Sequence, residues 1–164
     1  MPIAALLEHL EVDYHARMKE SILRIRILLD RMRQFGDADE WRPLAASFDA
    51  FRLALEEHLI KEQRVIFPHI RRLAAGQVGR ESRLGPIDRP LDLMEHEHER
   101  AAELFRALHE ESNGFALPHG ADGPTRMLFE ELADLWERFG AYVEIEDETL
   151  HPRTRQLERE TLSA

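Results

Sequence analysis

The chain has 164 residues, of which 43% are hydrophobic and 33% are charged, a composition typical of a globular rather than a disordered protein. This length suffices for one domain with its own core, so we predict a single domain over residues 1–164. The net charge of −10 disfavours contact with phosphate backbones and argues against a nucleic-acid partner. The absence of cysteine excludes disulfides, thiolate nucleophiles and cysteine-ligated clusters.

The hydropathy of the chain argues against a membrane-bound or secreted protein. No apolar run approaches the ~18–20 residues that a membrane-spanning helix needs. The first residues, MPIAALLEHLEVD, lack a basic region and include Glu8 and Glu11, so they do not resemble a secretory signal. We therefore expect a cytoplasmic protein with no membrane partner.

Helical periodicity runs through four stretches of the chain, and no stretch alternates as a strand would. The predicted helices are residues 3–34, 41–73, 90–111 and 124–159. Glycine and proline predict connections between them at residues 35–43, 74–90 and 112–124. Connections this short favour antiparallel neighbours, so the predicted fold is all-α, an antiparallel up-down-up-down four-helix bundle.

Each predicted helix carries an apolar stripe with steps of three and four residues, the seam that a bundle core requires. In chain order the stripes are Met18, Ile22, Ile25, Leu29 and Met32; Leu44, Phe48, Phe51, Leu55 and Val65; Met94, Ala101, Phe105 and Leu108; and Leu128, Leu132, Leu135 and Phe139. Six polar or ring side chains continue these stripes and, with alternating helix directions, fall at compatible levels. They are His15, His58, Glu62, His98, Tyr142 and Glu146.

Buried acids at this level predict a metal site in the bundle core. An unpaired carboxylate in an apolar core is costly, and two close carboxylates also repel each other. A metal pair removes both penalties, and imidazole with carboxylate suits iron, manganese or zinc in such bundles. Glu62 and Glu146 can bridge two metals, whereas each histidine binds one. Tyr142 is either a further ligand or a hydrogen-bond partner of the ligands.

An internal repeat supports a site with two related halves. The segment HLIKEQRVIFP, residues 58–68, matches YVEIEDETLHP, residues 142–152, in its main positions. Both have a ring residue, an acid four positions later and a proline six positions after the acid. In an antiparallel bundle this repeat predicts a pseudo-twofold site with one carboxylate from each half.

The remaining histidines do not fit the stripes, and we predict that they lie at the solvated surface. They are His9, His69, His109, His119 and His151. His96 is two residues from His98 and should point elsewhere on the same helix.

A ferritin-like site is an alternative, because Glu95 with His98 and Glu148 with His151 have Glu-x-x-His spacing. We reject it because Glu148 is about 200° around the helix from Glu146 and should face away from the stripe.

Over residues 3–155 the chain resembles the hemerythrin-like (HHE cation-binding) proteins, and among them the iron-centre repair group. The residues 90–105, PLDLMEHEHERAAELF, resemble the family's Pro-Ile-x-x-Met-x-x-Glu-His segment, which selects His98. HLIKEQRVIFP resembles its His-x-x-x-Glu segment ending in Phe-Pro, and DYHARM, residues 13–18, its first-helix histidine segment. The last-helix counterpart is YVEIEDETLHPR, with Tyr142 where the family has histidine.

The resemblance implies a cofactor of two iron ions joined by an oxo or hydroxo bridge, with manganese or zinc as substitutes. His15 and His58 would serve one iron and His98, with or without Tyr142, the other. Two departures are that MRQFG, residues 32–36, lacks a further histidine of the repair group, and that Met94 stands where hemerythrins pair a histidine with His98.

The functions that the resemblance implies are handling of nitric oxide, peroxide or oxygen, and iron donation in iron–sulfur cluster repair under nitrosative or oxidative stress. The expected partners are a diatomic or peroxide ligand, an iron–sulfur client protein or a second copy of the chain. Two alternatives are a non-catalytic oxygen or iron binder or sensor, and a degenerate bundle with one metal or none that acts through protein contacts. Whether the protein is an enzyme is left open.

Overall fold

The computed structural model describes residues 1–78 and 82–164, and within these ranges every regular element is a helix. Three short segments, labelled η, are π-helical. In chain order the elements are α1 (Ile3–His9), η1 (Leu10–His15), α2 (Ala16–Phe35), α3 (Ala38–Lys61), η2 (Glu62–Ile66), α4 (Phe67–Ala74), α5 (Asp88–Glu111), α6 (Gly123–Ile145), η3 (Glu146–Leu150) and α7 (His151–Ser163).

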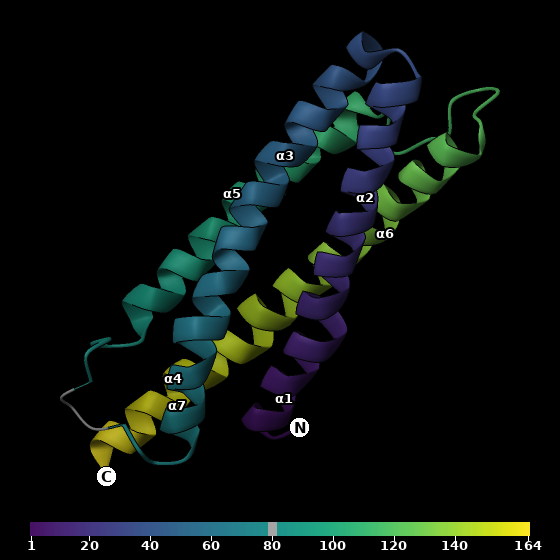
Figure 1. The fold of residues 1–164 in the computed structure, drawn as a ribbon. Helices are drawn as coiled ribbons and strands as arrows, with labels where there is room; N and C mark the ends of the chain where they lie inside the picture. The colour runs from purple at the N-terminus through teal and green to yellow at the C-terminus, as the bar shows by residue number, and fades with distance from the viewer. Residues whose placement is uncertain (79–81) are drawn as a thin grey trace.

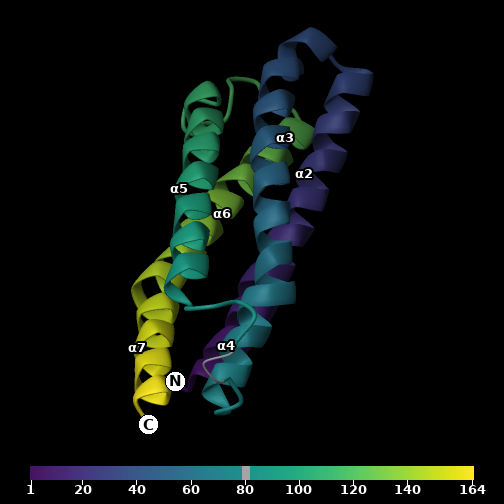
Figure 2. The ribbon, with the colours of Figure 1, turned by 90° about the vertical axis from the view of Figure 1, so that its left-hand side faces the viewer.

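These elements form four rods, which confirms the predicted all-α bundle. In Figures 1 and 2 the chain rises along α1 and α2, returns along α3 and α4, rises again along α5 and returns along α6 and α7. Helix α2 packs against α3 and α6, and α3 packs against α5. The predicted connection at residues 74–90 includes residues 79–81, which lie outside the described residues. No described helix is long and apolar enough to cross a membrane.

Two rods begin at aspartate caps, which fix where these helices start. The side chain of Asp37 accepts hydrogen bonds from the backbone nitrogens of Asp39 (3.0 Å) and Glu40 (3.4 Å). The side chain of Asp122 accepts one from Thr125 N (2.8 Å) and precedes Pro124, which suits a first helical turn.

Apolar layers lie on both sides of the predicted site level. On one side the stripes interdigitate, and the ring of Phe51 lies 4.2 Å from that of Phe105 and 5.5 Å from that of Phe139. On the other side α1 packs against α4, and α4 against α7. Buried residues of that second layer include Leu6, Leu7, Ile70 and Leu150. The site therefore lies between two apolar layers, where any buried polar group needs a hydrogen-bond or ionic partner.

The π-helical segments change which residues face the core, and they correct one prediction. At η2 the Phe67 nitrogen donates to the Glu62 carbonyl, five residues back instead of four. This one-residue insertion turns Val65 outward, to 44% exposure, and brings Ile66 and Phe67 inward, to 4% and 0%. The prediction that Val65 continues the stripe was wrong, because it assumed an unbroken α-helical period.

Candidate metal centre

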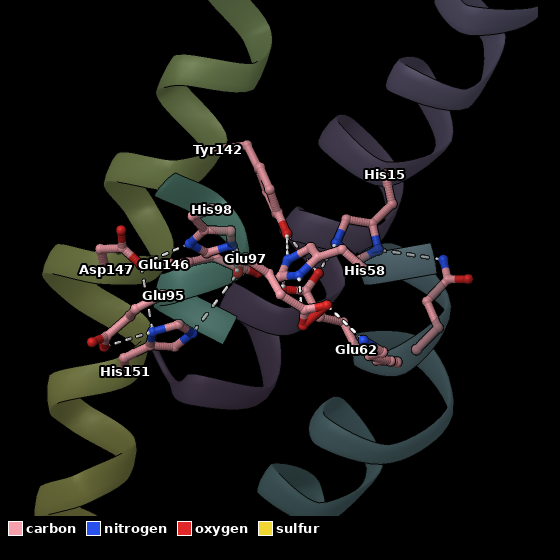
Figure 3. A network of polar contacts seen from close by, with 12 residues as sticks. His15, His58, Glu62, Glu95, Glu97, His98, Tyr142, Glu146, Asp147 and His151 are labelled. Atoms are coloured by element: carbon pink, nitrogen blue, oxygen red, sulfur yellow. Dashed lines mark hydrogen bonds and ion pairs between the residues drawn. The ribbon is translucent and has the colours of Figure 1, made fainter. Parts of the chain in front are cut away.

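The structure brings the six predicted site residues together in one cluster. His15 comes from η1, His58 from α3, Glu62 from η2, His98 from α5, Tyr142 from α6 and Glu146 from η3. Each of these residues is at most 1% exposed. Figure 3 shows that their side chains converge from all four rods.

Glu62 is the centre of one half of the cluster. Its Oε1 lies 2.7 Å from His58 Nε2, and its Oε2 lies 3.0 Å from His15 Nε2. The Tyr142 hydroxyl donates to Glu62 Oε2 at 2.6 Å and also lies 2.9 Å from His58 Nε2. The two oxygens of one carboxylate thus face different histidines, as a bridging carboxylate requires.

The other half is built around Glu146. Its Oε2 lies 3.2 Å from His98 Nε2. The same histidine nitrogen lies 3.7 Å from Glu62 Oε1, so His98 stands between the two carboxylates. Although Tyr142 is on the same rod as Glu146, its hydroxyl contacts Glu62 and His58 of the first half.

An acid beside the cluster orients the imidazole of His98, and a second acid lies near that of His58. His98 Nδ1 donates to Asp147 Oδ1 at 2.8 Å, and His58 Nδ1 lies 3.7 Å from Glu97 Oε2. Lys61 donates to Glu97 at 2.6 Å and holds it in place. The hydrogen bond from Nδ1 to an acid leaves Nε2 of His98 directed at the cavity, which is the arrangement of metal-bound histidines.

The protein environment shifts the pKa values of the two glutamates in opposite directions. Burial raises the pKa of Glu62, but the His58 charge and the close ring nitrogens of His15 and His98 outweigh burial and hold that pKa well below its ordinary value. Burial and the Glu62 charge raise the pKa of Glu146 well above its ordinary value. Burial also raises the pKa of Tyr142 far above 10, so its phenol stays neutral. Without a metal, the site therefore favours the charged form of Glu62 and the protonated form of Glu146.

The donor set fits a metal centre. Ligand atoms of His58, Glu62, His98 and Glu146 all lie within 4.8 Å of one another. Several buried atoms of the cluster find no hydrogen-bond partner among the described residues, although the ion-pair distances given above are short. They include His15 Nε2, His98 Nε2, Glu62 Oε1 and both carboxylate oxygens of Glu146. Orphaned nitrogen and oxygen atoms that face one another are the groups that a cation would satisfy.

The family model of the "Hemerythrin HHE cation binding domain" matches residues 6–154. The chain belongs to this family. The similarity thus covers all four rods and every predicted site residue of the HHE domain.

Curated relatives of this HHE chain carry the name "Iron-sulfur cluster repair protein YtfE". Those of Cronobacter sakazakii and Edwardsiella ictaluri are each 27% identical to it over 154 residues, and that of Escherichia coli O157:H7 is 24% identical over the same length. The alignments cover 93% of this chain and 66% of each relative. The chain therefore spans about two thirds of the length of these relatives.

Two histidines of the HHE domain that we predicted at the surface are buried, so this prediction was wrong for both. His69 is 2% exposed on α4, and His151 is 1% exposed at the start of α7. The η2 and η3 insertions precede these residues and shift their rods by one position. The repeat contained a usable signal, because His151 aligns with the apolar Phe67. His109 is half-buried and stacks on Trp136, with ring centroids 5.0 Å apart.

Two other predictions, about which side chains face the solvent, are confirmed. The side chain of His96 is 79% exposed, whereas His98 is buried. Glu148 is exposed, so the ferritin-like pairing of Glu148 with His151 does not form in the core.

Proposed function

We propose that the protein is a non-haem di-iron protein that handles nitric oxide, peroxide or oxygen, or donates iron to damaged iron–sulfur centres. The observation that carries this proposal is the buried cluster of histidine and glutamate atoms that face one another without hydrogen bonds. Iron, when bound, would supply electron transfer and an open coordination position. The family supports a bound cation, and the name of the relatives, iron–sulfur cluster repair proteins, supports iron over zinc or manganese.

The side chains would have different roles, as metal ligands or as a proton donor, according to their positions. His15 and His58 would hold one metal and His98 the other, while Glu62 and Glu146 would bridge them. The Tyr142 phenol is the neutral proton donor of the cavity, because its hydroxyl already donates to Glu62 at 2.6 Å. The apolar layers on both sides would exclude bulk water and admit small uncharged molecules such as nitric oxide or oxygen most easily.

The proposal is tested by a metal count and an electronic spectrum of protein purified without added metal. We expect about two iron ions per chain in the wild type, the number that two bridging carboxylates suit. The Glu148→Ala variant, which removes an exposed acid from the same turn as Glu146, should retain the same iron content. Wild-type protein that takes up no iron, even on reconstitution, would contradict the proposal.

The reaction is then assigned by exposing the reduced and the oxidised protein separately to nitric oxide, peroxide and oxygen. Peroxide consumption or nitric oxide reduction indicates a redox protein, whereas reversible oxygen uptake without turnover indicates a carrier. Iron transfer is tested by mixing the loaded protein with an enzyme whose iron–sulfur cluster has lost iron. Recovery of that enzyme's activity, absent with Glu62→Ala protein, supports a repair role.

A further inference from the structure

His151 is buried beside the candidate metal centre, although nothing in its α-helical spacing predicts this. Its Nε2 faces the Glu146 carboxylate, 3.8 Å from Oε2. Its ring lies parallel to that of His98, with centroids 5.9 Å apart and 5° between the planes. In Figure 3 His151 lies at the end of the cluster opposite His15.

The π-helical segment explains how His151 reaches this position. Its backbone nitrogen donates to the Glu146 carbonyl, so the residue five positions after the glutamate returns to the same face. Two ligands about 2.1 Å from one metal lie about 3.0–3.8 Å apart at ordinary coordination angles. The separation of 3.8 Å is too long for a hydrogen bond but suits two ligands of a shared ion.

Comparison of the two repeats shows that histidine and aromatic ring have exchanged places. Four residues before the glutamate stand His58 in one half and Tyr142 in the other. Five residues after the glutamate stand Phe67 and His151. Phe67 stacks on His15 (5.2 Å, 21°) just as His151 stacks on His98. Each half therefore has one histidine and one aromatic ring around its glutamate.

The outer side of His151 is arranged like that of His98, whose Nδ1 also donates to an acid. Nδ1 donates to Glu95 Oε1 at 3.1 Å, which leaves Nε2 without a hydrogen and directed at Glu146. Arg155 donates to Glu95 at 2.8 Å and to Asp92 at 2.8 Å, so it holds the acid in place.

We infer that His151 Nε2 is a metal ligand that replaces the histidine missing at Tyr142. This inference rests on the proposed metal centre and completes it as two equivalent sets, each with two histidines and one carboxylate. One set is His15, His58 and Glu62, and the other is His98, His151 and Glu146. A separate cation between His151, Glu95 and Asp147 is disfavoured, because Arg155 and His98 already pair with these acids.

The inference is tested with cobalt(II) alone, which reports its ligands through its visible spectrum. His151→Phe copies the Phe67 arrangement and keeps a ring stacked on His98. We expect this variant to lose about half of the bound cobalt and the corresponding part of the spectrum, since one of two metal positions lacks a ligand. The control is His69→Phe, which removes a buried histidine outside the cluster and should leave cobalt content and spectrum unchanged.

The outcomes separate this inference from the proposed function. Wild-type protein that binds no metal contradicts the proposed function itself. Wild-type protein that binds two cobalt ions and keeps both, with the same spectrum, in His151→Phe overturns only the role of His151. Circular dichroism of the metal-free variant establishes that it is folded.

A measurement on the wild type decides the question if the variant does not fold. In zinc-loaded protein with 15N-labelled histidine, the His151 ring should carry its hydrogen on Nδ1. It should also show no titration where free imidazoles titrate, because the metal replaces the proton on Nε2. A His151 ring that titrates freely, or carries hydrogen on Nε2, overturns the inference.

Discussion

The segments that follow His58 and Tyr142 have the same backbone plan but different side-chain chemistry. Each places a glutamate at the first residue of a π-helical segment and buries the residues four before and five after it. The environment nevertheless lowers the pKa of Glu62 and raises that of Glu146 in the metal-free state. The comparison teaches that the π-helical turn builds the site geometry, whereas burial and the neighbouring charges set the pKa of each glutamate.

The largest effect on metal binding and stability is expected from replacing Glu62. Glu62→Ala should abolish metal binding, because Glu62 faces His15, His58 and also His98, and thus touches both halves. It should also destabilise the metal-free protein by about 3–5 kcal/mol, since it leaves charged histidines buried without their partner. The checks are a metal count and a denaturant titration of the metal-free form.

Glu146→Ala is the matching change in the other half. It should lose metal as well, but it should destabilise the metal-free protein less than Glu62→Ala, because the raised pKa of Glu146 favours its uncharged form there. Conversion of Glu146 to leucine should retain a folded bundle, since it replaces a buried polar group by an apolar one. Wild-type metal content in either alanine variant would show that the corresponding carboxylate is not a bridge.

A second comparison concerns the two histidines of α5. His98→Ala should lower metal affinity by at least about 10–100-fold, the loss that even removal of a ligand's hydrogen-bond partner causes. His96→Ala should leave it unchanged, because the His96 side chain is 79% exposed. Isothermal titration with cobalt(II) measures both. Equal losses would mean that His96 also reaches the metal.

The charge asymmetry predicts how stability depends on pH in the metal-free protein. Burial lowers the pKa of His58, but the Glu62 carboxylate outweighs burial and raises it from 6.5 to about 9. This proton stabilises the folded state below pH 6.5, and its contribution is lost as the pH rises through 9. Unfolding experiments should show a loss of up to about 3 kcal/mol across this interval.

The His58→Gln variant should remove much of this pH dependence, whereas His96→Gln should leave it unchanged. The metal-loaded protein should show the opposite trend, because metal binding requires deprotonated ligands. A metal-free wild type whose stability is constant from pH 6.5 to 9 would contradict a charged His58.

The smallest expected effect concerns Tyr142, which we predicted either as a ligand or as a hydrogen-bond partner. Its donation to Glu62 and its raised pKa favour the neutral phenol. Ferric wild-type protein should then lack a phenolate charge-transfer band, and Tyr142→Phe should cost about 1 kcal/mol of stability through the lost hydrogen bond. A band that is present in the wild type and vanishes in Tyr142→Phe would instead establish direct ligation.

The sequence by itself determined the four helices, their apolar stripes and the level at which polar residues interrupt them. It also separated His98 from His96. These features follow from the α-helical period, a local property that three- and four-residue steps reveal along any one helix. His58 and Glu62 could be paired for the same reason, since they precede the inserted turn.

Only the tertiary structure decided the features that depend on the π-helical segments and on contacts between rods. The inserted residue after Glu62 exposes Val65, and the one after Glu146 buries His151, and neither insertion changes the local sequence pattern. The raised pKa of Glu146 likewise depends on packing between rods, because it arises from burial and from the charge of Glu62 on another rod. The physical reason is that a π-helical turn is locally unfavourable, so what stabilises it is packing and polar contacts between distant segments, which periodicity along one helix does not show.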